Sequence, residues 1–558
     1  MRNFCRFVLL CCSLLVVSRA EAQRPHNVIF IIVDDMSIAI DAFGNPQAPS
    51  PNFQRLMQHG VLFKTTYVSY PLCEPSRTAL FSGIRPDANG VVNNGTTNIR
   101  WKLGSDFRFF PEYFHDHGYR TEAFGKVGPC GEEDQISWDH IFKADHEEGH
   151  FDHVPTWWID TSAKTFTGTM GGINVDSLSV KIDHPAATPY LYALGLSTHN
   201  AFTPIMDSWN MTGDSTGTEL VPLDRYGTKT NVKGYQSALI KLPGGPPDDI
   251  SDIPAPAFNK DFYPQYTDQQ VRDIRHAYFA ELLEADMNLK TVIDELDKTN
   301  AWENTVVVFC SDHGLMMGEH GGLFLKNTLF EEALRIPFVI CAPGKLRGAV
   351  CEQPVEMIDL YPTLIELCGL PLKRGMQGVS LVPLLENPNI PLHDAVFSQR
   401  ALDLDQAKYG DPQARAVRTV KYHYNNWGDF GEELYDIQND PHEYTNLASD
   451  PAYAAVLQDM RKLLAEFMGA HEPVTQPLFV FPNPATGTVT ISYHSTTRAN
   501  VHLKIYDAVG KLVFTRQEVA SPGENRYQVF LGDLKTGTFI LQLDNGDSPQ
   551  QAKIIIQR

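Results

Sequence analysis

Two apolar, β-branched runs that each lead into acidic residues constrain the fold more than any other feature of this sequence. The first spans residues 27–33 and leads into Asp34 and Asp35, and the second spans residues 306–310 and leads to Asp312. Uninterrupted runs of this kind are typical of strands that are buried on both faces of a largely parallel sheet. Because open α/β sheets bind ligands at the carboxyl ends of their strands, the sequence predicts a site near these carboxylates.

A long helical pattern separates the two runs. Apolar residues recur with helical spacing over residues 273–296, and the pattern stops near Asn300. Strands that alternate with helices predict a doubly wound α/β core. After Pro371 the pattern weakens, and the sequence predicts a smaller α+β region, with a short sheet within residues 416–436 and a helix over residues 451–468.

The C-terminal part of the chain shows a third pattern. Residues 471–477 are predicted to be a linker, and short runs of alternating polarity within residues 478–558 predict a β-sandwich. A carbohydrate-binding module would fit such a sandwich, but an obvious exposed tryptophan platform is lacking. The predicted strands are residues 489–493, 501–506, 511–515, 527–531, 538–543 and 553–556.

The N-terminus has the features of a secretory signal peptide. Arg2 and Arg6 precede an apolar stretch over residues 7–17, and Ala20-Glu21-Ala22 offers a cleavage site. We therefore expect residues 1–22 to be removed and the protein to be secreted or attached to the cell surface. No other apolar run is long enough to span a membrane, so no transmembrane segment is expected.

Charge and cysteine content exclude some classes of function. The formal net charge of −21 argues against nucleic acid as a partner, because phosphate binding needs a basic surface. Three of the nine cysteines leave with the signal peptide, and no C-x-x-C pair remains. The sequence therefore predicts neither a zinc site nor a disulfide framework, although a bridge from Cys341 or Cys351 to a neighbour stays open.

The run from Cys73 to Gly83 reads C-E-P-S-R-T-A-L-F-S-G. It resembles the signature C-x-P-S-R-x-x-x-x-[ST]-G of type I sulfatases, which implies that a maturation enzyme oxidises Cys73 to the aldehyde formylglycine. A hydrated aldehyde carries two hydroxyls, so one can attack the sulfur of a sulfate ester and the other can later expel the sulfate. The alternative is a buried structural cysteine beside a Pro-Ser turn.

The resemblance to sulfatases covers roughly residues 26–470 and is nearest to iduronate-2-sulfatase-like members. It implies an alkaline-phosphatase-like α/β fold, with a catalytic domain over residues 23–375 and a C-terminal subdomain over residues 376–470. Besides the Cys73 signature and the first strand, the matching motifs follow in order along the chain: Ser50-Pro51-Asn52, Arg85-Pro86-Asp87 and Gly125-Lys126-Val127.

Hard divalent cations prefer oxygen ligands, chiefly carboxylates. The resemblance places Asp34, Asp35, Asp312 and an oxygen of modified Cys73 on one calcium ion. His313 matches a histidine of the iduronate-2-sulfatase-like group and is assigned to the metal site, although it could instead orient the hydrated aldehyde. The alternative for the first two aspartates is a solvated turn at a strand end.

Fixed cations are needed to hold the charge of a reacting sulfate. By resemblance Lys126 and Lys326 bind the sulfate, and Arg77, one helical turn from Cys73, stabilises the nucleophile. His199 matches the histidine that protonates the leaving alcohol, a task that Lys326 could share. The alternative for the two lysines is a solvated surface position, and the alternative for His199 is a structural role at a strand end.

One position departs from the iduronate-2-sulfatase-like pattern. A histidine is expected three residues after Lys126, and Pro129 stands there instead, so His150 or His153 could supply the missing contact. A segment after the signature places two cations around an aromatic ring, which could bind a uronate or could be a surface loop. These residues are Arg100, Trp101 and Lys102.

The C-terminal module resembles the sorting domain of type IX secretion systems. Pro482-Asn483-Pro484 opens it, Val509-Gly510 lies in its middle, Gly537-Thr538-Phe539 stands where Gly-x-Tyr is usual, and Lys553 marks a basic end. The resemblances to sulfatases and to this sorting domain together imply three partners for the chain. They are the type IX machinery, a formylglycine-generating or sulfatase-maturating enzyme, and a sulfated polysaccharide or oligosaccharide.

The sequence thus predicts a secreted, calcium-dependent sulfatase for polysaccharide degradation, acting on ulvan, fucoidan or glycosaminoglycan esters. A phosphonate monoester hydrolase or phosphodiesterase of the same superfamily is a second interpretation. A catalytically dead, carbohydrate-binding surface protein is a third, and the intact Cys73 signature argues against it.

Overall fold

A computed structural model gives the structure of the protein, and the chain divides into two compact units. The first unit comprises residues 1–86, 91–97 and 108–463, and the second comprises residues 87–90, 98–107 and 464–558. The structure describes residues 26–94, 103, 107–128, 138–142, 168–170, 173–175, 189–197, 267–373, 375–402, 413–470, 479–481, 487–495, 498–507, 511–521, 523–532, 534–544 and 550–556.

The first predicted strand lies inside an eight-stranded sheet of order β14-β2-β13-β9-β1-β8-β4-β5. β1 (Asn27–Asp34) pairs in parallel with β8 (Tyr190–Ser197) and with β9 (Thr305–Ser311), so both acidic runs follow neighbouring strands. The mixed sheet is confirmed, because β13 (Phe338–Cys341) runs antiparallel to β9. The remaining strands are β2 (Val61–Phe63), β4 (Arg120–Phe124), β5 (His140–Phe142) and β14 (Ala349–Cys351).

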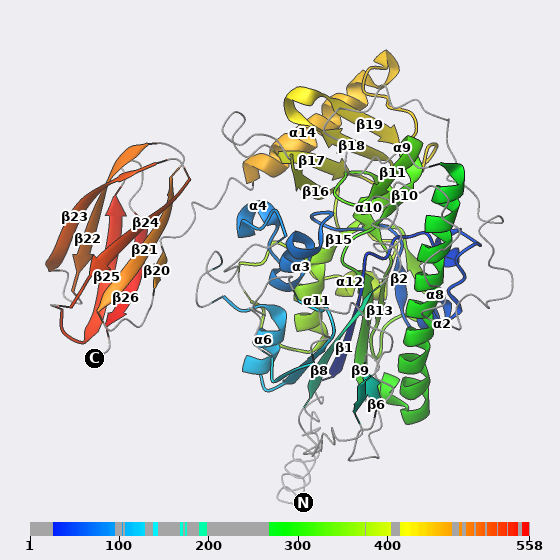
Figure 1. Ribbon diagram of the computed structural model, residues 1–558, viewed down its shortest axis with the longest axis horizontal. Coiled ribbons are helices and arrows are strands. Elements are labelled where there is room, and N and C mark those ends of the chain that lie inside the picture. The colour runs from blue at the N-terminus through cyan, green and yellow to red at the C-terminus, as the bar shows by residue number, and fades with distance from the viewer. Residues whose placement is uncertain are drawn as a thin grey trace, which may run out of the picture. The chain divides into compact units, whose positions relative to one another are not determined.

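Helices cover both faces of this sheet (Figure 1). Successive side chains of a strand point to opposite faces, so Ile29 and Ile31 share a core with α8 and α2 while Phe30 faces the other way. Phe30 packs edge-on against Phe81 and Phe110, with ring centroids 5.8 and 5.5 Å away. The helices are α2 (Pro51–His59) and α8 (Asp268–Thr299) on one face, and α3 (Cys73–Ser82), α6 (Phe110–Asp116) and α11 (Leu360–Leu367) on the other.

The predicted smaller α+β region is confirmed. An antiparallel sheet of order β16-β17-β18-β19 precedes α14 (Ala454–Ala470). Its strands are β16 (Val396–Ala401), β17 (Gln413–Arg418), β18 (Tyr422–Asn426) and β19 (Glu432–Asp436). Shorter elements of the first unit are β3 (Thr66–Tyr67), β6 (Gly168–Met170), β7 (Ile173–Val175), β10 (Met316–Gly318), α9 (Glu319–Gly322), β11 (Leu323–Leu325), α10 (Glu331–Leu334), β12 (Arg335–Ile336), β15 (Val355–Glu356) and α12 (Val382–Glu386).

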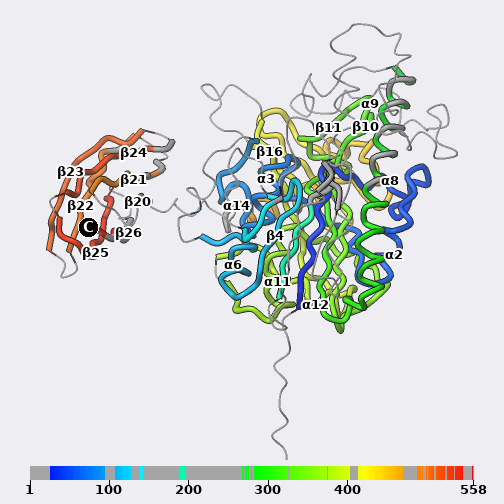
Figure 2. Tube along the Cα trace, turned by 60° about the horizontal axis from the view of Figure 1, so that its bottom comes forward, coloured from blue at the N-terminus to red at the C-terminus, as the bar shows by residue number. Residues whose placement is uncertain are grey.

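The second unit contains two antiparallel sheets, visible as the orange and red strands of Figure 2. Apolar residues of both sheets, such as Val489, Ile491, Leu503 and Leu541, share one hydrophobic core, which makes the module a β-sandwich as predicted. One sheet has the order β20-β21-β24 and the other β23-β22-β25-β26, with β20 (Phe479–Phe481), β21 (Thr488–Ser495), β22 (Ala499–Tyr506), β23 (Leu512–Ala520), β24 (Gly523–Phe530), β25 (Gly537–Asp544) and β26 (Gln550–Ile556).

Two further predictions concern membranes and disulfides. Within the described ranges, no helix combines the length and the apolar character needed to cross a bilayer. Cys341 and Cys351 are free, buried thiols, so the bridge that the sequence left open is not formed. The predicted signal peptide over residues 1–22 and the predicted linker over residues 471–477 lie outside the described residues.

A buried carboxylate of α8 holds the start of α2. Helix α2 has no side-chain cap of its own, and the Asp286 carboxylate accepts hydrogen bonds from the backbone N–H groups of Asn52 (3.0 Å) and Phe53 (2.7 Å). It also accepts one from the Asn52 side chain at 2.7 Å. The first N–H groups of a helix have no partner within the helix, so Asp286 satisfies them from outside.

We expect Asp286→Ala to lower the free energy of unfolding by about 2 kcal/mol or more, because buried donors lose their acceptor. Asp294→Ala is the matched control on the same helix. Asp294 also contacts α2, through Arg55 at 2.9 Å, but this pair is exposed, so its loss should cost less than about 1 kcal/mol. Denaturant unfolding of both variants checks the difference, and equal costs would contradict the assigned capping role.

Candidate active site

Three aspartates meet at the carboxyl ends of β1 and β9. The parallel register pairs Val33 with Ser311, which sets Asp34 and Asp35 beside Asp312. The backbone N–H of Asp35 donates to Asp312 Oδ1 at 3.0 Å, and all three side chains are almost completely buried. The sequence placed these residues at strand ends, and the structure brings them into one cluster.

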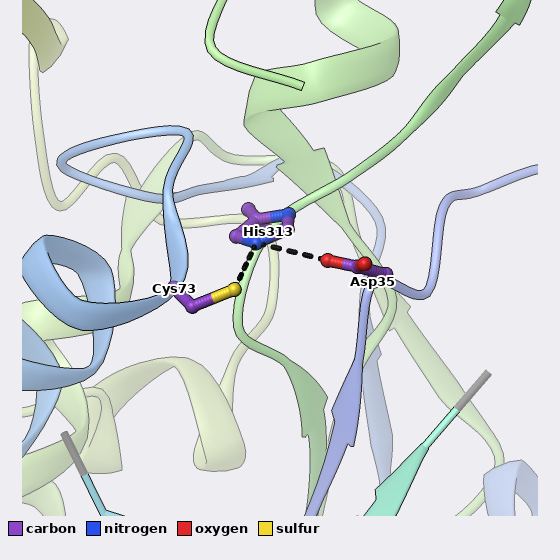
Figure 3. Close-up of side chains that lie close together, drawn as sticks. All are labelled: Asp35, Cys73 and His313. Atoms are coloured by element: carbon purple, nitrogen blue, oxygen red, sulfur yellow. Dashed lines mark hydrogen bonds and ion pairs between the residues drawn. The ribbon is translucent and has the colours of Figure 1, made fainter. Parts of the chain in front are cut away.

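Cys73 is the first residue of α3 and faces this cluster. Its Sγ lies 3.0 Å from Lys326 Nζ, 3.3 Å from His313 Nε2 and 3.8 Å from Lys126 Nζ, and Figure 3 shows it pointing toward the imidazole. Burial raises the pKa of the Cys73 thiol to about 12, although Lys326 opposes the shift. The unmodified side chain is therefore a neutral thiol at ordinary pH and a weak nucleophile.

Arg77 joins the two strand ends to α3. Its guanidinium donates to Asp34 Oδ1 at 2.8 Å and to Asp312 Oδ2 at 2.9 Å, and it is completely buried. The same group donates to the backbone carbonyls of Lys126 (2.6 Å) and Val127 (2.9 Å). The predicted role of Arg77 beside the nucleophile stays a prediction, and its described hydrogen bonds run to the two carboxylates and to the loop that carries Lys126.

Lys126 lies in the loop after β4, and Lys326 is the residue that follows β11. Their ammonium groups approach Cys73 from these two segments. Lys126 Nζ contacts the Asp34 carboxylate at 2.8 Å, and Lys326 Nζ contacts Asp35 Oδ1 at 2.5 Å. Burial alone would lower the pKa of Lys326, but Asp35 and the other carboxylates raise it well above its usual value. Lys326 is therefore a positive charge next to the sulfur.

His313 has a defined tautomer, assigned from its hydrogen bond. Its Nδ1 lies 2.8 Å from the Gly314 carbonyl oxygen, which can only accept, so Nδ1 carries a proton. In a neutral ring Nε2 then offers a lone pair, and it faces Asp35 Oδ1 at 3.1 Å (Figure 3). These two acceptors repel each other, and a metal ion between them would relieve the repulsion.

The donor set fits a divalent cation. Ligand atoms of Asp35, Cys73 and His313 lie within 4.8 Å of one another, and so do those of Asp34, Cys73 and Asp312. This spacing is compatible with a calcium ion, whose oxygen ligands lie about 2.3–2.6 Å away. Imidazole suits calcium poorly, so the carboxylates are the better ligands.

Several residues around the cluster were not assigned a role from the sequence. Ser311 Oγ accepts from the Met36 N–H at 2.9 Å, and Tyr278 contacts the same turn from α8. Gly314 permits a close approach, because a Cβ there would lie 2.0 Å from the Glu332 carbonyl oxygen. Ser311 and Gly314 lie close to Asp312 in the sequence, so they could have been predicted to belong to the site. Tyr278 could not, because its spacing is that of an ordinary apolar position of its helix.

Other predicted site residues lie outside the described part of the chain. No placement is given for His199, for Pro129, or for the possible substitutes His150 and His153. The same holds for the predicted sugar-binding segment Arg100, Trp101 and Lys102. The acid and the substrate contacts of the site therefore stay predictions.

Known protein families match most of the described chain. Residues 26–153 and 246–370 match the family described as "Sulfatase", and residues 318–469 match "N-sulphoglucosamine sulphohydrolase, C-terminal". Residues 479–557 match "Secretion system C-terminal sorting domain". The first two matches include every described residue of the cluster around Cys73.

Individual relatives align over most of both sequences. A Delta 4,5-hexuronate-2-O-sulfatase of Bacteroides thetaiotaomicron is 26% identical and covers 85% of this chain and 95% of its own. The iduronate 2-sulfatase of Mus musculus is 25% identical, with 82% and 97% covered. The solved structure of a 2-O GAG sulfatase shares the fold with a TM-score of 0.61 at 23% identity, covering 81% of this chain and 93% of that one. This chain belongs to the sulfatase family of enzymes and carries a secretion-system sorting domain at its C-terminus.

Proposed function

We propose that this enzyme hydrolyses sulfate esters of a sulfated polysaccharide or its oligosaccharides, through an oxidised Cys73. The proposal rests mainly on the charged groups that surround Cys73. Its sulfur lies against two lysine ammonium groups and beside three buried carboxylates at neighbouring strand ends. This arrangement supports a site that binds an anion next to position 73, with room in its donor set for a divalent cation.

The charged groups have separable tasks in this proposal. Lys326 and Lys126 would hold the sulfate oxygens, because their Nζ atoms lie 3.0 and 3.8 Å from Cys73 Sγ. Arg77 would fix Asp34 and Asp312 in place, since its described hydrogen bonds run to both of them. Charge stabilisation by such fixed groups is usually the largest contribution to catalysis of this kind.

Two groups would complete the site. Asp34, Asp35 and Asp312 would hold a calcium ion, which would supply positive charge against the sulfate oxygens. Oxidation of Cys73 by a formylglycine-generating or sulfatase-maturating enzyme would supply a hydrated aldehyde as the nucleophile on sulfur. In this proposal one hydroxyl of the hydrated aldehyde would bond to sulfur while the bond between sulfur and the sugar oxygen breaks, and the sugar would leave as an alcohol with a proton that we assign to His199. The other hydroxyl would then lose its proton as the bond between carbon and the sulfate oxygen breaks, which releases sulfate and restores the aldehyde. Water would hydrate the aldehyde again, so one water is consumed for each ester.

The substrate class rests on relatives and on the C-terminal domain. The similar proteins bear the names Delta 4,5-hexuronate-2-O-sulfatase, iduronate 2-sulfatase and N-acetylglucosamine-6-O-sulfatase, all of which refer to sulfated sugars. The sorting domain supports export through a type IX system to the medium or the cell surface. An exported enzyme suits a polymer too large to import, such as ulvan, fucoidan or a glycosaminoglycan.

We expect Cys73→Ser to reduce hydrolysis of nitrophenyl sulfate by about 10³-fold or more when the chain is made in a host that modifies only cysteine, because the proposed nucleophile is lost. Cys368→Ser is the matched control, since Cys368 is a buried free thiol that is not part of the Cys73 cluster. Peptide mass measurement should find CHO in place of CH₂SH at residue 73 in the active enzyme. Full activity of Cys73→Ser, or of an enzyme whose Cys73 is unmodified, would refute the mechanism.

A panel of esters separates sulfatase activity from that of a phosphonate monoester hydrolase or phosphodiesterase. We expect the highest kcat/KM on nitrophenyl sulfate, and lower values on the matched phosphate and phosphonate esters. Sulfate release from defined sulfated oligosaccharides then identifies the sugar and the sulfate position. A higher kcat/KM on the phosphonate would instead favour the second activity.

A further inference from the structure

The turn after β1 holds Asp35 in an unusual backbone conformation. Its φ of +60° lies in the left-handed region, which is uncommon for residues other than glycine and costs free energy. In this conformation the carboxylate reaches both Lys326 Nζ, at 2.5 Å, and His313 Nε2, at 3.1 Å (Figure 3). Such strain persists only where surrounding groups hold the backbone in place.

One hydroxyl group from α8 holds this turn. Tyr278 Oη–H donates to the Asp35 carbonyl oxygen at 2.7 Å, and the oxygen accepts from the Ser37 N–H at 2.8 Å. The Tyr278 side chain is completely buried, and because a carbonyl oxygen can only accept, the hydroxyl is the donor in the contact with Asp35. A single side chain thus satisfies a carbonyl and an N–H group of the same turn.

The other contacts of the turn come from the end of β9. The Asp35 N–H donates to Asp312 Oδ1 and the Met36 N–H donates to Ser311 Oγ. Tyr278 adds a contact from α8, which packs in the same core as β1. Loss of its hydroxyl would leave two buried backbone groups without these partners, which favours a relaxed turn and a displaced carboxylate.

We propose that Tyr278 is a positioning residue that holds Asp35 in the geometry needed to bind the divalent cation. This inference rests on the proposed function, because it assumes that Asp35 is a cation ligand. Tyr278 itself is not a ligand, since its hydroxyl is engaged by the backbone. Partners that orient metal ligands typically change metal affinity by about 10–100-fold when they are removed.

The test is Tyr278→Phe in the full-length enzyme. Calorimetric titration with calcium chloride after chelation should show a Kd raised about tenfold or more. The calcium concentration that gives half-maximal hydrolysis of nitrophenyl sulfate should rise by the same factor, and excess calcium should restore most of kcat. A purely structural defect would lower the melting temperature without this shift in calcium affinity.

Tyr67→Phe is the matched control, because Tyr67 is equally buried and its hydroxyl donates to Glu331 at 2.7 Å. It should keep the wild-type Kd. If Tyr278→Phe fails to fold, Ser311→Ala loosens the same turn and should also raise the Kd. An unchanged Kd in the folded variant overturns the role of Tyr278 alone, whereas a wild-type enzyme that binds no calcium overturns the proposed function and this inference with it.

Discussion

The contact of the Arg77 guanidinium with Asp34 and Asp312 is the interaction on which the site depends most. It crosses between β1 and β9 and ties both strand ends to α3, the helix that begins with Cys73. Buried ions are costly unless they are paired and hydrogen-bonded, and removing one partner of such a pair typically costs about 3–5 kcal/mol. The planar guanidinium suits this position because it donates in several directions at once, which a lysine ammonium does not reproduce.

There is a physical reason why the elements that hold the site could be predicted from the sequence. A strand buried on both faces has to be apolar throughout, so β1 and β9 are visible as uninterrupted apolar runs. The acidic residues at the ends of these runs mark the carboxyl ends of the strands. Short strands such as β2 and β13 carry too few residues for a clear pattern. Tyr278 was not recognisable either, because its role depends on where α8 packs and not on its spacing along the helix.

The small C-terminal sheet also contributes to the site, which its sequence did not indicate. Arg400 of β16 donates to the carbonyl oxygen of Asn327, the residue after Lys326, and its guanidinium lies 5.9 Å from the ring centroid of Trp427. Asn327 has a φ of +70°, and its N–H donates to Pro71 at 2.9 Å. The segment that carries Lys326 is thereby fixed between the start of α3 and the C-terminal sheet.

The position of Cys73 has a consequence for the order of events during biosynthesis. Only 3% of its surface is exposed, and every residue of α3 is buried. A second protein that reacts with this thiol has to reach its sulfur atom, and within the described part of the folded chain that atom is buried. The oxidation of Cys73 that we propose would therefore precede folding, and a molecule that folds too early would keep its thiol for as long as the native state lasts.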